Sequence, residues 1–312
     1  MRYATCNSVT GRHLKVAGHS LGTPDLSVGE ALALFARIGC DGAELIWQDG
    51  YPAAIPENAA DSFVRDTRSR AADLNLEVAA LTPYMTGINS LDGAERARDV
   101  ERFRACIATA HALQCERIRV YAGAYLPSDA GSRDEMWRRL VESLQLLGEE
   151  AVQAGVVLCV ENHFNTMTVS ASETADLVQT VGSPGVGVLY DQANLTFTHH
   201  ETPESAIDIQ APWIRHVHVK DLVFVKPEAA FRASAVATVD KSERNVRSRV
   251  VGDGILDWKD IISRLAGNGY DGYLSLEYEY RWHPQDLPRP EDGIGRSVTA
   301  VRRYLSELSH QA

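Results

Sequence analysis

Short apolar runs rich in β-branched residues alternate along the chain with longer segments whose apolar positions recur every three or four residues. The first pattern is typical of buried strands, and the second is typical of helices that cover them. Strands are predicted over 2–6, 42–46, 76–82, 117–123, 156–161, 186–191, 214–221 and 273–279. Helices are predicted over 27–39, 57–74, 92–114, 133–154, 171–181, 203–210, 257–267 and 292–308. Ser27 with Glu30 three residues on forms a capping box, which marks the start of the first helix.

The strict alternation of strands and helices predicts a parallel sheet, because each parallel crossover needs a helix. Eight such units in 312 residues predict an α/β fold, a single (β/α)₈ TIM barrel over residues 1–312. A doubly wound open sheet is the alternative, but no glycine-rich phosphate loop follows the first predicted strand. The longest irregular stretch, about 223–256, is expected to be a lid or binding segment, with a surface excursion or subunit contact as the alternative.

Polar residues stand at the predicted ends of four consecutive strands, where barrel enzymes place their active sites. In chain order they are Glu161, Asp191, His216 and His218 on one strand, and Glu277 and Glu279 on the last. Carboxylates gathered at one rim would repel one another, and a cation removes that repulsion. Oxygen ligands with one imidazole suit Mn²⁺, Mg²⁺, Co²⁺, Fe²⁺ or Zn²⁺. The sequence therefore predicts one bound divalent metal ion, with Mn²⁺ as the first choice.

Five motifs resemble the xylose isomerase-like barrel superfamily, which groups sugar isomerases, ketose 3-epimerases, inosose dehydratases and repair enzymes of the endonuclease IV type. They are VENH (160–163), LYDQANL (189–195), HVHVKD (216–221), GDGILDW (252–258) and GYLSLE (272–277). The resemblance implies that the metal ligands are Glu161, Asp191, His218 and Glu277. The choice of His218 over His216, and of Glu277 over Glu279, rests on this resemblance.

A metal ion in such a site can polarise a substrate carbonyl and stabilise the enediolate that forms when the neighbouring proton leaves. In the epimerases of the superfamily the two glutamates remove and return this proton, which implies catalytic roles for Glu161 and Glu277. His163 is a second candidate acid or base, and a loop histidine bonded to backbone is the alternative. Substrate contacts are predicted for Asn162, Asn194, His216, Lys220, Tyr84 and Trp47. A salt bridge between Lys220 and Asp221 is the alternative for that lysine.

Two positions depart from the ketose 3-epimerases. Those enzymes carry a histidine three residues after the metal-binding aspartate and an arginine six residues after the metal histidine, where this chain has Asn194 and Phe224. HVHVKD followed by GDG is similar instead to inosose dehydratases and to the catalytic subunits of C-glycoside deglycosidases. The resemblance thus implies a β-elimination, either cleavage of a keto glycoside or dehydration of an inosose. Sugar isomerisation or epimerisation through the same enediolate is the alternative, and a non-catalytic binding barrel is a third.

The composition limits the classes of molecule that this protein is expected to bind. The formal net charge is −11 with no basic stripe, which argues against a nucleic-acid partner. No run approaches about 20 apolar residues, so we expect no membrane span. Five scattered cysteines without a CxxC pair fit reduced thiols and a cytoplasmic location. The expected partners are a small carbohydrate substrate and further subunits, in a homo-oligomer or in a hetero-oligomer with a small partner subunit.

Overall fold

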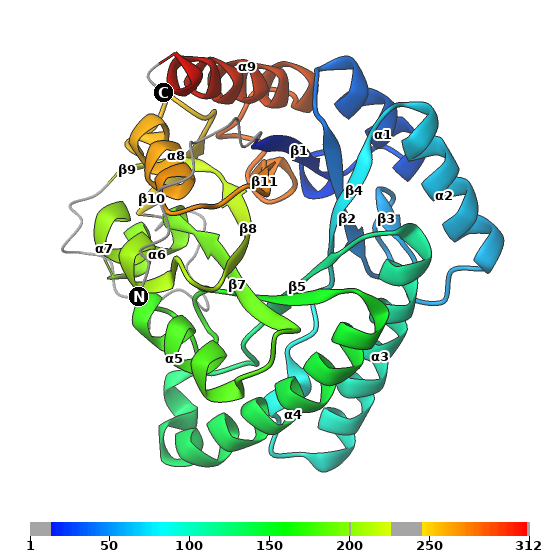
Figure 1. The fold of residues 1–312 in the computed structure, drawn as a ribbon, viewed down its shortest axis with the longest axis vertical. Coiled ribbons are helices and arrows are strands. Elements are labelled where there is room, and N and C mark those ends of the chain that lie inside the picture. Colours follow the sequence, from blue (N-terminus) through cyan, green and yellow to red (C-terminus); the bar gives the residue numbers. More distant parts are fainter. Residues whose placement is uncertain (1–13, 200, 226–244, 311–312) are drawn as a thin grey trace, which may run out of the picture.

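The computed structural model describes residues 14–199, 201–225 and 245–310, and its centre is a closed barrel of eight parallel strands. The ring closes because β1 pairs with both β11 and β2, as Figure 1 shows looking into the barrel. Its strands are β1 (Lys15–His19), β2 (Gly42–Trp47), β4 (Glu77–Thr82), β5 (Arg117–Tyr121), β6 (Val157–Glu161), β7 (Val186–Asp191), β8 (Ile214–Val219) and β11 (Tyr273–Leu276). A two-residue strand, β3 (Ala54–Ile55), pairs with β2 outside the ring. The predicted TIM barrel is confirmed.

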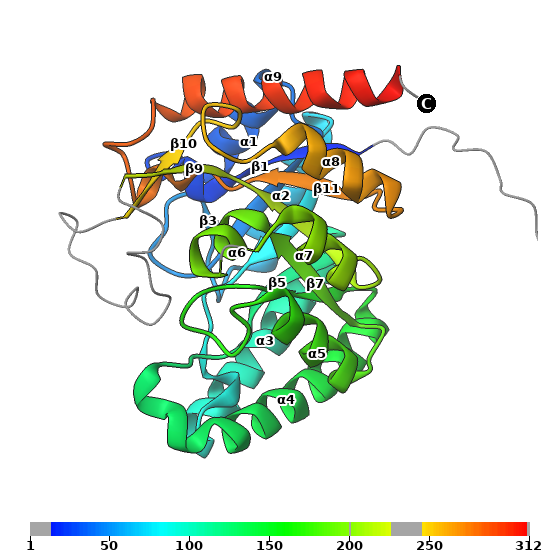
Figure 2. The same cartoon turned by 90° about the vertical axis from the view of Figure 1, so that its left-hand side faces the viewer.

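Helices surround the strands and bury their apolar faces against the outside of the barrel (Figures 1 and 2). They are α1 (Val28–Arg37), α2 (Asp61–Asp73), α3 (Gly93–Leu113), α4 (Arg133–Ala154), α5 (Ala171–Val181), α6 (Gln192–His199), α7 (Pro203–Gln210), α8 (Trp258–Gly267) and α9 (Pro290–Ser309). The predicted capping box at Ser27 and Glu30 is present at the start of α1. The helix α6 was not predicted, because its sequence QANLTFTH has little apolar periodicity.

The first barrel strand is not the one that the sequence predicted. The range 2–6 lies outside the described residues, and β1 is formed instead by KVAGH at Lys15–His19. Gly18 in this strand lies against Phe35 of α1, and a Cβ at position 18 would come within 2.4 Å of the Phe35 ring. A strand that needs glycine for close packing and ends in histidine lacks the β-branched run by which strands are recognised.

The long segment predicted at about 223–256 is bounded by two paired strands. β9 (Asp221–Phe224) and β10 (Val246–Arg249) form an antiparallel pair at the end of β8. Residues 226–244, on which most of the predicted lid or binding segment falls, lie outside the described residues.

Asp221 holds the GDG turn that follows β10. Its two carboxylate oxygens accept hydrogen bonds from the backbone N–H groups of Leu222, Gly252, Gly254 and Leu256, at 2.9–3.2 Å. A Cβ at Gly254 would lie 2.0 Å from Asp221 Oδ1, so only glycine fits there. The aspartate of HVHVKD and the GDG motif therefore form one structural unit beside the barrel mouth.

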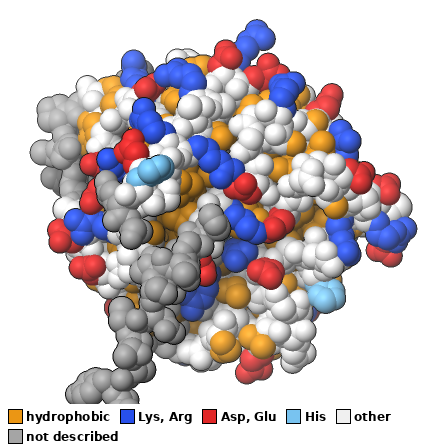
Figure 3. All heavy atoms as spheres, turned by 45° about the horizontal axis from the view of Figure 1, so that its top comes forward, with side chains coloured by type: hydrophobic (Ala, Val, Ile, Leu, Met, Phe, Trp, Pro, Cys, Tyr) orange, Lys and Arg blue, Asp and Glu red, His pale blue; other side chains and the backbone are white. Residues whose placement is uncertain are grey.

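The outside of the molecule gives two further observations. Among the described helices, none combines the length and apolarity that crossing a membrane requires. On the face in Figure 3, acidic and basic side chains are interspersed over the described residues, without a continuous basic stripe. That face therefore offers no extended track for a phosphate backbone.

Candidate metal centre and active site

The interior of this barrel is polar, whereas TIM-barrel interiors are commonly filled by branched apolar side chains. Alternate residues of each strand point inward. The fully or almost fully buried polar side chains on the barrel strands are His19, Glu44, Thr82, Arg119, Glu161, Asp191, His216, His218 and Ser275. A buried polar group is costly without a partner, so this interior is built for a specific arrangement of charges and hydrogen bonds.

The four predicted metal ligands converge at the C-terminal end of the barrel. Glu161 ends β6, Asp191 ends β7, His218 lies on β8, and Glu277 follows β11 directly. One ligand atom of each lies within 4.8 Å of those of the others, and all four side chains are buried. They meet because β6, β7, β8 and β11 are neighbours in the ring.

The hydrogen-bond network turns one ring nitrogen of His218 toward the three carboxylates. His218 Nε2 lies 3.1 Å from Glu44 Oε1, which accepts its hydrogen bond. Nδ1 then faces Glu161 Oε1 and Glu277 Oε2, each at 3.4 Å, and makes no hydrogen bond of good geometry. Three carboxylate oxygens around one ring nitrogen are a suitable donor set for a divalent cation, and a carboxylate on the far side of the ring is the usual support for a metal-binding histidine.

Positive charge already lies among the carboxylates. Lys220 Nζ is 2.6 Å from Glu277 Oε2 and 2.9 Å from Asp191 Oδ2. The predicted alternative, a salt bridge with Asp221, is wrong, because Asp221 is occupied by backbone N–H groups. Burial would lower the pKa of Lys220, but the charges of Asp191 and Glu277 raise it well above its usual value.

The carboxylates respond differently to their surroundings. Burial would raise the pKa of Glu161, but His218 and Arg119 lower it to about 2. Burial likewise opposes the charge of Glu277, and Lys220 and His218 hold its pKa well below the usual range. Burial raises the pKa of Asp191 to about 7. Burial would lower the pKa of His218, whereas Glu277 and Glu44 raise it well above 6.5. The centre thus favours cations, and a metal ion would displace the extra proton of His218.

Glu44 on β2 was missed by sequence reasoning. Its carboxylate accepts hydrogen bonds from His216 Nε2 at 2.8 Å, from His218 Nε2 and from the Thr82 hydroxyl. His216 therefore lies one layer below the metal ligands and braces Glu44, instead of facing the mouth as a substrate contact. The signal was an acid at an inward position of the apolar strand GAELIW, which the search of strand ends did not cover.

Arg119 on β5 was also missed. Its side chain is 1% exposed, and Nη1 donates a hydrogen bond to Glu161 Oε2 at 3.1 Å. The guanidinium carbon stacks 3.8 Å from the centroid of Tyr121 and 4.4 Å from that of Tyr84. The alternation in RIRVY places Arg119 and Tyr121 on the same inward face, which is the signal that could have found it.

We expect Arg119→Met to lower the free energy of unfolding of the metal-free protein by about 3–5 kcal/mol, because Glu161 would keep a buried charge without its partner. Chemical denaturation of metal-free protein measures this. The matched control is Arg37→Met, which breaks the exposed Arg37–Glu291 pair and should cost under about 1 kcal/mol. If both variants lose the same free energy of unfolding, the buried Arg119–Glu161 pair stabilises the protein no more than an exposed pair does.

The two asparagines predicted as substrate contacts hold the metal ligands in place. Asn162 donates to the carbonyl of Asp191 at 2.8 Å and accepts from its backbone N–H at 3.2 Å, so both ends of its amide are engaged. Asn194 donates to Glu161 Oε1 at 3.3 Å and to the carbonyl of Asn162 at 3.0 Å. Of the side-chain amide atoms of these two asparagines, Asn194 Oδ1 is the one without a hydrogen-bond partner among the described residues.

His163 and Tyr84 lie at the mouth, partly exposed. The His163 ring lies 4.7 Å from that of Tyr121, and its Nδ1 is 2.7 Å from the carbonyl of Phe164. Nδ1 therefore carries the proton, and Nε2 keeps the lone pair that a general base needs. The backbone bond that was the alternative interpretation of His163 is present, and it is compatible with a role as base. The hydroxyl of Tyr84 is buried without a hydrogen-bond partner in the described structure.

Trp47 does not join the site. Its ring is 1% exposed, and its Nε1 donates to Thr109 Oγ1 of α3 at 3.3 Å. Because Glu44 points into the barrel, the side chain three positions later on the same strand points outward, into the helix layer. The Trp47 ring thus faces α3 in the helix layer, and its predicted substrate contact stays a prediction.

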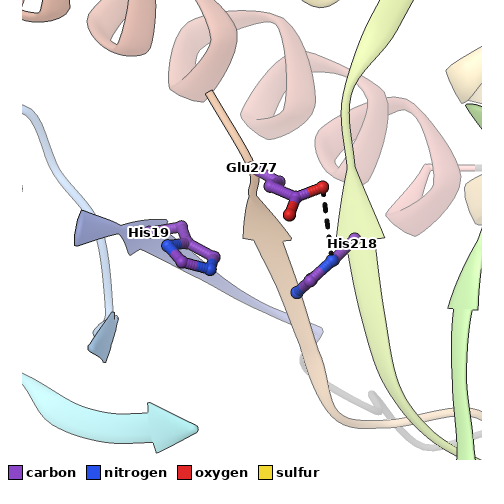
Figure 4. Close-up of side chains that lie close together, drawn as sticks. All are labelled: His19, His218 and Glu277. Atoms are coloured by element: carbon purple, nitrogen blue, oxygen red, sulfur yellow. Dashed lines mark ion pairs between the residues drawn. The ribbon is translucent and has the colours of Figure 1, made fainter. Parts of the chain in front are cut away.

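His19, at the end of β1, is the third residue that sequence reasoning missed. It is fully buried, and its ring centroid lies 5.6 Å from that of His218. Figure 4 shows its ring turned toward His218 and Glu277, across from β8 and β11. Burial lowers the pKa of His19 to about 4, so this imidazole is neutral at physiological pH.

Comparison with known proteins relates the chain to one family of barrels. A family model described as the xylose isomerase-like TIM barrel matches residues 32–304. The chain is 28% identical over 153 residues to an inosose dehydratase of Bacillus thuringiensis (strain Al Hakam), covering 47% of this chain and 48% of that protein. It is 25% identical over 228 residues to an inosose dehydratase of Yersinia enterocolitica, covering 69% and 72%. The chain thus spans about half the length of the Bacillus relative.

Solved structures share the fold. The IolI protein with a bound zinc atom superposes with a TM-score of 0.76 at 17% identity, covering 95% of this chain and 99% of that one. An L-ribulose 3-epimerase gives 0.75 at 20% identity, covering 96% and 97%. A probable 3-DHS dehydratase, AsbF of Bacillus anthracis, gives 0.69 at 18% identity, covering 93% and 99%. At these identities the likeness concerns the fold alone.

Proposed function

Since the chain belongs to the xylose isomerase-like TIM barrel family, we propose that it is a divalent-metal-dependent enzyme that removes the proton next to the carbonyl of a keto sugar or cyclic keto polyol and then eliminates a β leaving group. The observation that carries the proposal is the convergence of Glu161, Asp191, His218 and Glu277 within 4.8 Å at the barrel mouth. The similarity to inosose dehydratases supports a dehydration or a related keto-glycoside cleavage.

A divalent ion held by these four residues, Mn²⁺ being our first choice, would supply Lewis acidity toward the oxygens of the substrate. The protein supplies the bases. The pKa values of Glu161 and Glu277 are lowered, which favours their ionised forms, and the two come from β6 and the end of β11, with β7 and β8 between them. The partly exposed His163 presents an Nε2 lone pair. One of these groups takes the α-proton, and the electron pair left on carbon expels the β substituent. The departing hydroxide or aglycone takes up a proton from a neighbouring acid, for which His163 is suitably placed once protonated.

The buried charges favour an uncharged substrate. Four buried carboxylates, those of Glu44, Glu161, Asp191 and Glu277, are offset by the cations of Arg119 and Lys220 together with one divalent ion. An additional carboxylate or phosphate on the substrate would leave a buried negative charge without a partner, which is costly at low dielectric. A neutral keto polyol or keto sugar adds no charge.

Reaction in D₂O with Mn²⁺ and a panel of an inosose, a 3-keto glucoside and D-fructose separates the candidate reactions. We expect the inosose or the keto glucoside to lose water or aglycone and to form an unsaturated ketone. The epimerase alternative predicts α-deuterated ketose and its epimer with no loss of a leaving group. Brisk epimerisation of fructose without consumption of the other two would decide against elimination. No exchange with any member would decide against both and favour a binding barrel.

A further inference from the structure

We propose that His19 is a further catalytic residue, which donates a hydrogen bond from Nε2–H to the carbonyl oxygen of the substrate and to the oxyanion that develops there. The inference rests on the proposed function and deepens it. Through His19, β1 would supply a hydrogen-bond donor to the substrate, which the metal ligands on β6, β7, β8 and after β11 do not provide. The ligand atom that His19 recognises is an oxygen of a neutral ketone.

The position of His19 is the first argument. It ends β1 at the C-terminal side of the barrel, in register with Glu44 of β2. A ring nitrogen of His19 lies within 4.8 Å of ligand atoms of His218 and Glu277. In Figure 4 the three side chains surround one space, with His19 on the side opposite His218. A substrate oxygen bound next to the metal ligands would therefore lie within reach of His19.

The tautomer of His19 is fixed by the backbone. The N–H of Leu21 donates to His19 Nδ1 at 3.0 Å, in the short helical turn Ser20–Gly22 that follows β1. Nδ1 must therefore carry the lone pair, and the proton of the neutral ring must be on Nε2. The backbone thus presents an N–H donor to the site.

This donor has no acceptor among the described residues. The nearest carboxylate oxygen paired with it, Glu44 Oε1, is 3.6 Å away and already accepts from Thr82 and His218. A fully buried N–H group without an acceptor is rare in proteins because it loses its hydration. At the end of a barrel strand, the group that satisfies it is a ligand oxygen.

The same tautomer excludes His19 as a metal ligand. A metal-bound nitrogen offers its lone pair, and at Nε2 of His19 a proton occupies that place. In His218 the arrangement is reversed, because Nε2–H donates to Glu44 and the Nδ1 side faces the carboxylates. The two rings, 5.6 Å apart, therefore offer complementary groups to the centre: His218 a lone pair, and His19 a hydrogen.

A neutral imidazole that is positioned before the substrate arrives stabilises an oxyanion without giving up its proton. Two substitutions separate this role from the others. His19→Asn places an amide oxygen near the former Nδ1, where it can accept from the N–H of Leu21, but removes the donor to the site. His19→Gln places an amide N–H near the former Nε2. We expect α-deuterium exchange with the inosose or the keto glucoside to fall about 10²–10³-fold in kcat for His19→Asn, and to recover in part for His19→Gln.

Two measurements need no turnover. Mn²⁺ titration should give the same Kd for wild type and His19→Asn, and thermal melting should show both folded. Nitrogen NMR of histidine-labelled, metal-free wild type should place the His19 proton on Nε2, and added inosose should shift that resonance in the metal-loaded protein, for which Mg²⁺ replaces the paramagnetic Mn²⁺.

Three results would overturn the proposal: a 10–100-fold loss of Mn²⁺ affinity in His19→Asn, which would make His19 a metal ligand or a support of the ligands; a proton on Nδ1; or undiminished exchange by His19→Asn. If wild type itself exchanges no deuterium with any ketone of the panel, the proposed function fails. In that case a His19 Nε2 resonance that still shifts with inosose would support recognition of the ketone oxygen, and an unchanged one would overturn it.

Discussion

Asp191→Ala should abolish stoichiometric binding of the divalent ion and, with it, nearly all α-proton exchange. Asp191 ends β7, is fully buried and offers a carboxylate oxygen to the same space as Glu161, His218 and Glu277. Removal of one of three anionic ligands leaves Lys220 and the protonated His218 to neutralise the other two, so the centre no longer needs a metal cation. His218→Ala should have the same result, because it removes the only nitrogen of the set. The measurement is elemental analysis after dialysis with Mn²⁺, followed by the exchange assay.

The barrel should still fold in both variants. Each substitution removes one buried polar side chain and leaves a cavity of that size, while the apolar contacts between strands and helices stay in place. Circular dichroism and a thermal melt check this. The matched control is Asp208→Ala, an exposed aspartate of α7 outside the site, which should keep full metal content. Full metal occupancy in Asp191→Ala and His218→Ala would show that the ligand assignment is wrong.

The second large effect is expected for the glutamates as bases. Glu277→Gln and Glu161→Gln should each lower the rate of α-proton exchange by at least about 10²–10⁴-fold, because an amide cannot take up the proton. Each amide also weakens the metal site, so the assay must be run at saturating Mn²⁺ as well as at limiting Mn²⁺. A loss that remains at saturation belongs to proton transfer, and a loss that disappears belongs to metal affinity.

The control for this pair is Glu279→Gln. Glu279 is two positions after Glu277, so a strand would place both side chains on the same face. Only the family resemblance assigned the metal to Glu277 and not to Glu279. In the structure Glu279 Oε2 accepts from Ser248, and Oε1 is 3.7 Å from Lys220, so it lies beyond the cluster of ligands. We expect Glu279→Gln to retain most of the activity. If instead Glu279→Gln is inactive and Glu277→Gln is active, the roles of the two residues are exchanged.

Most of the barrel could be predicted from the local pattern of apolar and polar residues. The periods of apolar residues located seven of the eight barrel strands, because strand and helix periodicities repeat over a few residues and do not depend on distant partners. The exceptions have physical reasons. β1 contains a glycine that Phe35 requires and ends in His19, so it lacks a typical strand composition. Trp47 is aromatic and near a strand end, but the inward position of Glu44 turns it toward α3.

A polar residue at the end of a buried strand is a local signal, and this signal gives the barrel and six candidate residues at its mouth; the family resemblance then narrows the six to the four that converge. The residues that support these four ligands come together only in the closed barrel. Glu44 contacts His216 and His218 across 172 and 174 positions of the chain, and such pairs form only when the barrel closes. Arg119 reaches Glu161 from the neighbouring strand, and Leu21 fixes the hydrogen of His19 through the turn after β1. Which nitrogen of a histidine faces the site depends on what the other nitrogen contacts, and that contact is a property of the folded chain.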